Sequence, residues 1–164
     1  YGPWGRPDMA LFKFTNNILS GNPIDVYNYG KMKRDFTYVG DLVKAIELLI
    51  PKIPPNPDCR NEKINFDSIS DTAAYRIVNI GNSNPINLMD YISELEKSLN
   101  IVAKKNFLPM QDGDVKETSS NTDLLYALTN FRAKKTVKEG ISEFVVWYKS
   151  YYKLSKLWKF QLLV

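Results

Sequence analysis

The chain has 164 residues, which is enough for one domain with a hydrophobic core. It contains no histidine and one cysteine, Cys59, so a Ser-His-Asp triad, a histidine-based zinc site and an internal disulfide are excluded. The 22 Lys and Arg exceed the 18 Asp and Glu by four, and the four lysines of the last sixteen residues account for this excess. The rest of the chain therefore lacks the basic balance typical of nucleic-acid binding.

No apolar run approaches the ~20 residues that span a bilayer, and no signal-peptide pattern opens the sequence. A single cysteine fits a reducing compartment. We therefore expect a cytoplasmic protein without membrane, nucleic-acid or metal partners. The first residue is Tyr1 rather than Met, which leads us to expect that the sequence begins within a longer one.

Helical periodicity and capping residues predict the elements of the first half. Two glycines and two prolines place residues 1–8 in a loop, after which Asp8 is a suitable N-cap for a helix. The elements expected next are, in order, that helix at Met9–Ser20, a short strand at Ile24–Tyr27, a polar loop at Asn28–Arg34, a β-prone segment at Asp35–Val39, and a second helix at Asp41–Ile50. Residues 51–72 hold four prolines and are expected to form a surface excursion.

The second half shows the same alternation of strand and helix signals. Its expected elements are a strand at Tyr75–Ile80, a helix at Leu88–Leu99 capped by Asn87, a short strand at Ala103–Leu108, a tight turn at Gln111–Asp114, a short helix at Asn121–Leu128, and a last helix at Val137–Tyr152 that begins with a Thr136/Glu139 capping box. This order predicts an α/β fold with short strands and flanking helices.

Glycine-rich nucleotide-binding loops are absent from the sequence, and none of its Tyr-x-x-x-Lys pairs lies within a predicted helix. The eight glycines form neither Gly-x-Gly-x-x-Gly nor a Walker A loop, so the chain has no recognisable phosphate cradle. Residues four apart face each other only on a helix, whereas the Tyr-x-x-x-Lys pairs of this sequence lie in a predicted strand, a loop and the terminal tail: Tyr27/Lys31, Tyr29/Lys33 and Tyr152/Lys156. We expect none of these pairs to be catalytic.

Several side chains have both an ordinary and a functional interpretation. Arg34 is either a solvated loop charge paired with Asp35 or a clamp for a phosphate group. Tyr27 is either a core residue or a stacking platform for a flat ring. Arg6 is either a surface charge or an anion contact carried by a loop, and Asp114 after a glycine is commonly a turn former.

Four stretches in register resemble the UDP-glucuronate 4-epimerase family of NAD-dependent epimerases and dehydratases, which has the extended short-chain dehydrogenase/reductase fold. They are Tyr1-Gly-Pro-Trp-Gly-Arg-Pro-Asp-Met9, Pro23–Asn28, Gly30–Tyr38, and Asn106–Gln111 with Gly113-Asp-Val115. The resemblance runs to about Tyr152 and covers only the C-terminal portion of such an enzyme. It implies that the glycine-rich NAD loop and the catalytic Tyr-x-x-x-Lys lie in an N-terminal half that this sequence does not include.

The resemblance implies the C-terminal part of an extended Rossmann-type epimerase, mainly its small substrate-binding domain, over residues 1–152. Residues 153–164 are then an extra basic, aromatic tail, either a helix that binds a membrane surface or a partner, or an extension without a role. The implied reaction interconverts UDP-glucuronate and UDP-galacturonate through a 4-keto sugar, with NAD carrying the hydride and the full-length protein forming a possible homodimer. The alternatives are a related sugar-nucleotide epimerase, decarboxylase or dehydratase, and a non-catalytic module that binds UDP-sugars.

The resemblance also implies roles for particular residues, none of them catalytic. Tyr27 corresponds to an aromatic residue that packs on uracil, and Arg34 to the arginine that grips the diphosphate. The remaining substrate-binding candidates are Arg6 at the uronate end, Asp8 and Met9 beside the uridine diphosphate, and Asp114 near the ribose. Related epimerases often carry a second phosphate-binding arginine where this chain has the non-basic Gln111 and Asp112.

Overall fold

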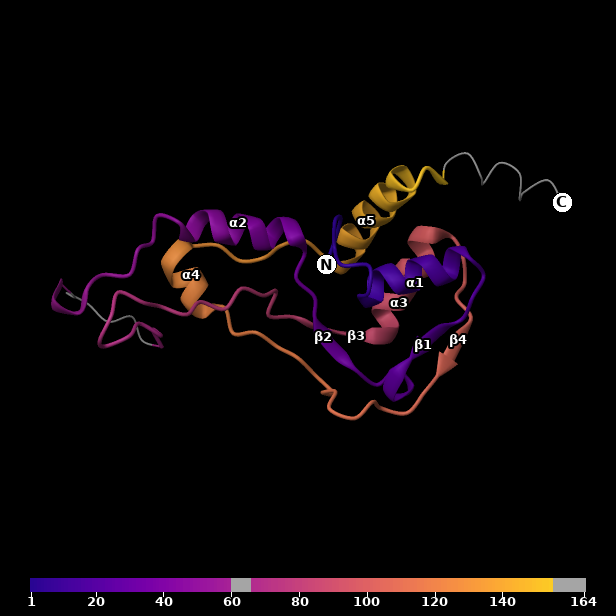
Figure 1. Ribbon diagram of the computed structural model, residues 1–164, viewed down its shortest axis with the longest axis horizontal. Coiled ribbons are helices and arrows are strands. Elements are labelled where there is room, and N and C mark those ends of the chain that lie inside the picture. The colour runs from indigo at the N-terminus through magenta and orange to yellow at the C-terminus, as the bar shows by residue number, and fades with distance from the viewer. Residues whose placement is uncertain (60–65, 155–164) are drawn as a thin grey trace.

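The computed structural model describes residues 1–59 and 66–154, and their elements alternate as the sequence predicts for an α/β fold (Figure 1). The elements are, in chain order, α1 (Ala10–Leu19), β1 (Ile24–Val26), the 3-10 turn η1 (Tyr27–Gly30), β2 (Lys33–Asp35), α2 (Val39–Leu49), the 3-10 turn η2 (Pro57–Cys59), β3 (Pro85–Asn87), α3 (Leu88–Leu99), β4 (Lys105–Phe107), α4 (Asp123–Thr129) and α5 (Val137–Tyr151).

The strands form two small two-stranded sheets. β1 pairs in parallel with β4, with Ile24 opposite Lys105 and Val26 opposite Phe107. Ile24 and Val26 are fully buried while Asp25 between them is exposed, as the two-residue period of a strand requires. β2 pairs in antiparallel fashion with β3, across about fifty residues of intervening sequence.

The hydrophobic core lies between α1, α3, α5 and β1, which we call the body (Figure 1). α3 and α5 pack along each other, and their apolar faces supply fully buried side chains such as Ile92, Leu95 and Phe144. Burial of side chains of this size contributes roughly 1.5–3 kcal/mol each. The body therefore holds most of the stabilising apolar contacts of the described chain.

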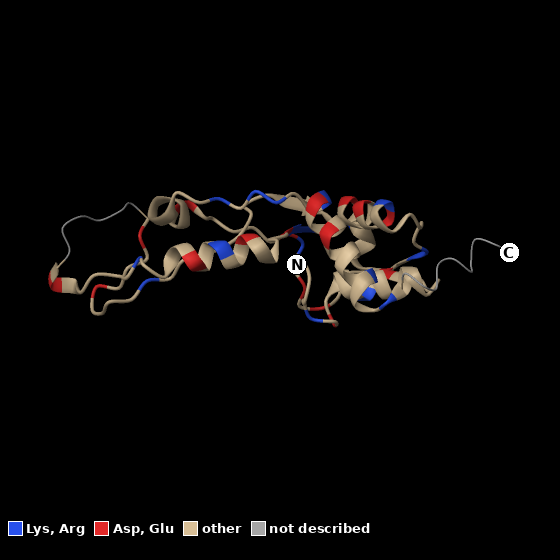
Figure 2. Ribbon diagram, turned by 90° about the horizontal axis from the view of Figure 1, so that it is seen from above, with Lys and Arg blue, Asp and Glu red and all other residues tan. Residues whose placement is uncertain are grey.

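α2, α4 and the segments beside them extend away from the body, and we call residues 39–59, 66–82 and 123–129 the arm (Figures 1 and 2). α2 and α4 contact each other there, and Ala45 and Leu125 are buried. Ala45 is the one buried residue of α2, whereas Val43 and Ile46 of this helix, and Ile50 directly after it, are 49% exposed or more. The arm thus has little core of its own.

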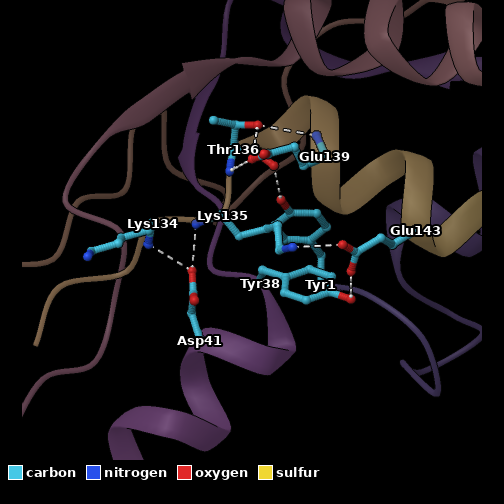
Figure 3. Close-up of polar contacts among 8 residues, drawn as sticks. All are labelled: Tyr1, Tyr38, Asp41, Lys134, Lys135, Thr136, Glu139 and Glu143. Atoms are coloured by element: carbon cyan, nitrogen blue, oxygen red, sulfur yellow. Dashed lines mark hydrogen bonds and ion pairs between the residues drawn. The ribbon is translucent and has the colours of Figure 1, made fainter.

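A polar cluster fastens the start of α2 to the start of α5 (Figure 3). The Asp41 carboxylate accepts hydrogen bonds from the backbone amides of Lys134 and Lys135, at 2.9 and 2.8 Å. The Tyr38 hydroxyl donates to Glu143, and Lys135 Nζ donates to the other oxygen of the same carboxylate at 2.7 Å. These bonds link the arm to the body.

The capping box predicted at the start of the last helix is confirmed. Thr136 Oγ1 accepts from the Glu139 amide at 3.2 Å, and the Glu139 carboxylate accepts from the Thr136 amide at 2.9 Å. The Tyr1 hydroxyl donates to the Thr136 carbonyl at 3.2 Å (Figure 3). The cap therefore also holds the first residue of the chain.

Several predicted boundaries are wrong because partners distant in sequence decide them. Met9, not Asp8, is the N-cap of α1, and it makes no side-chain capping bond. The predicted loop Asn28–Arg34 includes the start of β2, because Lys33 pairs with Asn87, and the β-prone end of Asp35–Val39 begins α2 instead. Asn87 does precede α3, but its side chain donates to Asp90 rather than capping the helix.

The strand predicted at Tyr75–Ile80 is irregular in the structure. The Ile77 amide donates to the hydroxyl of Ser68 at 3.1 Å rather than to the backbone of a neighbouring strand. Arg76 is held there by a two-point ion pair with Asp67, at 2.8 and 2.9 Å. Apart from the bond of the Ser70 amide to the Tyr75 carbonyl at 2.8 Å, side chains thus take the place of the backbone ladder that a strand needs. The tail predicted for residues 153–164 lies outside the described residues except for its first two.

Within the described residues, no helix is long and apolar enough to cross a membrane. In the same part of the chain, no group of acidic or cysteine side chains gathers closely enough to bind a metal ion.

Candidate functional site

A cavity of about 610 Å³ opens where the N-terminal loop, the first turn of α1, the end of β1, β2 and the segment 114–118 meet. This volume is within the range of small-molecule sites. Five of the six predicted binding residues line it, namely Arg6, Met9, Tyr27, Arg34 and Asp114. Three stretches that are far apart in the sequence therefore contribute to one concave surface.

Arg34 reaches the cavity from the centre of β2. Its Nη1 donates to the Lys33 carbonyl at 2.9 Å, and its Nη2 donates to Asp114 Oδ1 at 2.8 Å. The two side chains are 25% and 32% exposed, so the pair is partly shielded but still open to the cavity. The ordinary interpretation that pairs Arg34 with Asp35 is wrong, because Asp35 accepts instead from the amide of Ser83 at 3.0 Å.

Tyr27 lies at the end of β1, where the chain reverses direction. Asn28 and Tyr29 adopt left-handed conformations, with φ of 49° and 52°, and Gly30 follows with φ of 79°. A Cβ on Gly30 would also come within 2.7 Å of the Met89 side chain, so both the backbone conformation and the space favour glycine there. This turn keeps Tyr27 half-buried in the cavity lining and directs the next residues back into β2.

Arg6 and Met9 reach the cavity from the loop that leads into α1, together with the first residues of that helix. Met9, Ala10 and Leu11 line the cavity, so the positive end of the α1 dipole lies on this side, and no acidic residue occupies the first turn of the helix. Asp8 is not part of the lining. Its carboxylate accepts from Arg6 Nε at 3.1 Å, and this hydrogen bond lowers the pKa of Asp8 below its ordinary value.

An aromatic wall that the sequence analysis did not single out closes one side of the cavity. The Phe36 and Tyr91 rings stack with centroids 4.0 Å apart, and the Tyr1 ring meets both edge-on at 6.0 Å. Burial raises the pKa of both tyrosine hydroxyls. The signal for this wall would have been Tyr91 on the apolar face of α3, but only the tertiary fold shows that α3 borders the cavity.

Asp25 is a second lining residue that the sequence analysis missed. It occupies the exposed position of β1, and its carboxylate accepts from Asn106 of β4 at 2.9 Å. Of the Tyr-x-x-x-Lys pairs, Tyr27/Lys31 is divided between two cavities: Tyr27 lines the main one, and Lys31 lines a separate one of about 430 Å³. Lys156 of the pair Tyr152/Lys156 lies outside the described residues. The main cavity is lined by aromatic rings and by two arginines, and this lining suits a ligand that is partly flat and partly anionic.

Comparison with known proteins agrees with this geometry. Residues 1–65 match the NAD dependent epimerase/dehydratase family. The chain is 53% identical over 154 residues to an uncharacterised 37.6 kDa protein of Escherichia coli O111:H-, of which it covers 46%. It is 47% identical over 155 residues to a probable UDP-glucuronate 4-epimerase of Rhizobium meliloti, of which it covers 45%. These alignments include 94% and 93% of this chain.

A solved structure shows the same architecture. The UDP-glucuronic acid 4-epimerase of Bacillus cereus, in complex with UDP-glucuronic acid and NAD, superimposes with a TM-score of 0.72 at 26% identity. The alignment covers 93% of this chain and 43% of that one. The chain therefore spans about half the length of the relatives it matches. Its first 65 residues match the model of the NAD dependent epimerase/dehydratase family, and nearly its whole length is similar to the C-terminal portion of proteins named as UDP-glucuronate 4-epimerases.

Proposed function

We propose that this chain forms the UDP-sugar-binding portion of an NAD-dependent epimerase that interconverts UDP-glucuronate and UDP-galacturonate. The observation that carries the proposal is the convergence of Tyr27, Arg34 and the N-terminal end of α1 on one cavity. An aromatic ring, a guanidinium and free helix amides are the groups that a nucleoside diphosphate needs for recognition. The similarity to proteins named as UDP-glucuronate 4-epimerases supports the choice of sugar.

In this proposal the nucleotide end of the substrate lies along β1 and β2. The uracil ring packs on Tyr27, and the diphosphate accepts hydrogen bonds from Arg34, whose planar donors match phosphate oxygens. Backbone amides in the first turn of α1 contribute further donors to the uridine diphosphate, and Met9 lines the cavity beside them. Asp114 accepts a hydrogen bond from a ribose hydroxyl.

The sugar end lies toward the N-terminal loop. Arg6 is the cation that this loop contributes to the cavity lining, and a uronate carboxylate is the group on the substrate that distinguishes it from a neutral hexose. Arg6 is 76% exposed and pairs with Asp8. We expect it to exchange Asp8 for the substrate carboxylate.

NAD supplies the hydride transfer in this family. The sequence of this chain lacks the glycine-rich turn that binds the diphosphate of this cofactor. η1 after β1 contains one glycine, and β2 leads into α2 without a Gly-x-Gly-x-x-Gly turn. We therefore infer that NAD and the acid/base pair are bound or supplied by polypeptide outside these 164 residues. Homodimerisation is likewise proposed for the larger protein and not for these residues alone. The 164 residues alone are expected to bind substrate without turning it over.

The test is calorimetric titration of the chain with UDP, UDP-glucuronate, UDP-galacturonate and UDP-glucose, beside an Arg6→Gln variant. We expect tighter binding of the two uronates than of UDP-glucose, and a loss of about fivefold for the uronates alone in the variant, since exposed ion pairs contribute up to ~1 kcal/mol. Lys13→Gln is the matched control, because Lys13 is exposed on α1 and outside the cavity lining. Equal affinities for all four ligands would refute the uronate assignment.

A further inference from the structure

The arginine proposed to grip the diphosphate already holds an anion of the protein itself. We propose that Asp114 is a positioning residue that occupies and aims Arg34, and that the diphosphate binds by displacing the Asp114 carboxylate. This inference rests on the proposed function for the identity of the ligand. Its geometric basis is the contact between Arg34 Nη2 and Asp114 Oδ1 at 2.8 Å, in the wall of the cavity.

A carboxylate and a phosphate compete for the same donors of a guanidinium. Arg34 Nη1 is anchored on the Lys33 carbonyl at 2.9 Å, which leaves the Nη2 side directed at Asp114. Both classes of anion bind this fork through oxygen atoms in its plane. The Nη2 hydrogen that is donated to Asp114 therefore becomes available to an incoming phosphate only when the carboxylate gives it up.

The Asp114 carboxylate is delivered to this position by the backbone rather than by a freely rotating side chain. Its Oδ1 also accepts from the Val115 amide at 2.8 Å, and the Asp114 amide donates to the Gln111 carbonyl at 3.3 Å in the preceding turn. Further along, the Lys33 amide donates to the Lys116 carbonyl at 2.9 Å. Thr118 completes the connection, because its amide donates to the Lys33 carbonyl at 3.2 Å. The segment 114–118 thus lies along β2 and holds the carboxylate against Arg34.

Two consequences follow for binding. The held carboxylate keeps the Arg34 side chain extended into the cavity, so less side-chain freedom is lost when the ligand arrives. The same carboxylate weakens the intrinsic attraction of the site for a bare anion. Once displaced, it is free to accept a ribose hydroxyl, which a nucleotide offers and inorganic pyrophosphate lacks.

The experiment uses inorganic pyrophosphate as the probe, because it presents the diphosphate chemistry without the ribose. The whole 164-residue chain is titrated in its wild-type form and as Asp114→Asn, which retains an oxygen for the Val115 amide. We expect the variant to bind pyrophosphate about two- to fivefold more tightly, in line with the strength of partly exposed ion pairs. The double variant Arg34→Gln/Asp114→Asn should bind pyrophosphate no more tightly than Arg34→Gln alone, because no guanidinium remains to be released.

The control separates release of Arg34 from a general change of charge. Glu117→Gln removes one acidic charge from the same segment. Glu117 lies outside the cavity lining, and its Oε2 is 3.9 Å from Lys33 Nζ, so it does not occupy Arg34. This variant should leave pyrophosphate affinity unchanged. A gain in Glu117→Gln equal to that in Asp114→Asn would overturn the proposal, and so would unchanged or weaker binding in Asp114→Asn.

Titration with UDP distinguishes this inference from the function on which it rests. If wild type binds UDP but Asp114→Asn binds pyrophosphate no more tightly than wild type does, the positioning role of Asp114 is overturned and the proposed function is not. Absence of UDP binding by the folded wild-type chain overturns the proposed function, whereas the pyrophosphate comparison still decides whether Asp114 occupies Arg34.

Discussion

Single side chains outside the cavity hold its aromatic wall in place. The Tyr1 ring of the wall packs against Phe36 and Tyr91, and its hydroxyl is fixed by the Thr136 carbonyl. Tyr38 lies beside Tyr1, with ring centroids 5.7 Å apart, and donates to Glu143 (Figure 3). Burial, together with this bond to a carboxylate, raises the pKa of Tyr38 to about 12. The wall thus depends on polar and charged groups at the start of α5.

Glu143 gives a pH-dependent prediction. Hydrogen bonds from Lys135 and then from Tyr38 lower its pKa below the ordinary value of 4.5. A carboxyl whose folded-state pKa is lowered contributes stability above its unfolded pKa and loses that contribution as the pH falls through the folded pKa. We expect wild type to exceed Glu143→Gln in free energy of unfolding above pH 4.5, with the difference closing below it.

The measurement is urea unfolding at about pH 7 and about pH 3. Glu47→Gln serves as the matched variant, because it also removes one acidic charge, from the exposed surface of α2. A difference between wild type and Glu143→Gln that stays constant over this range would show that the contacts with Lys135 and Tyr38 do not stabilise the fold.

At the scale of elements, local chemistry predicts the helices well and the strands poorly. The Thr136/Glu139 box is contained within four residues, so the sequence shows both partners. β2 exists because Lys33–Asp35 pairs with Pro85–Asn87, and no local pattern encodes that partner. Tyr75–Ile80 has strand-forming side chains but lacks a strand neighbour within the described residues. A helix shows its cap and its apolar face within its own residues, whereas a strand is defined by a partner that is distant in sequence.

The candidate site, like the fold, was predictable from the sequence only in part. The residues identified through short motifs that line one cavity are Arg6, Met9, Tyr27, Arg34 and Asp114. Asp8 was identified in the same way, but its partner is Arg6 and it lies outside the lining. Asp25 and the ring of Tyr91 were missed, because an alternating strand and a helical apolar face are equally consistent with plain core packing. Tertiary contacts alone show that they border the cavity.

The capping box of α5 gives a prediction for an element. Thr136→Ala removes the acceptor for the Glu139 amide and should lower the free energy of unfolding by about 1 kcal/mol. Ser142→Ala is the control, because Ser142 is exposed within the same helix, where alanine is at least as favourable as serine. Equal stability of Thr136→Ala and wild type in chemical denaturation would contradict the role assigned to the cap.

At the scale of the whole molecule, the body and the arm differ in how they are stabilised. The body packs three helices and β1 around one core. The arm buries Ala45 and Leu125 but leaves much of α2 exposed, and Asp41 joins its base to the segment before α5. The cavity lies on the body side, beside β2. Ligand binding and arm stability should therefore be separable.

Hydrogen exchange tests this division. Segments with few buried apolar contacts open at a lower free energy than the global unfolding reaction. We expect backbone amides of α2 and α4 to exchange faster than those of α3 and α5 under native conditions, as followed by mass spectrometry of peptides. Uniform protection across the four helices would contradict the division into body and arm.

In the function proposed above, this chain carries a pocket for a UDP-sugar in which Arg34 holds the diphosphate. The most direct measurement is calorimetric titration of wild type and Arg34→Ala with UDP, with Lys31→Ala as control, since Lys31 is exposed and lines the separate cavity. We predict saturable binding by wild type and Lys31→Ala, and a loss of about tenfold or more in Arg34→Ala, as expected when a charged hydrogen-bonding group is removed. Binding of UDP that is equally strong in Arg34→Ala, or no binding by the folded wild-type chain, would contradict the account.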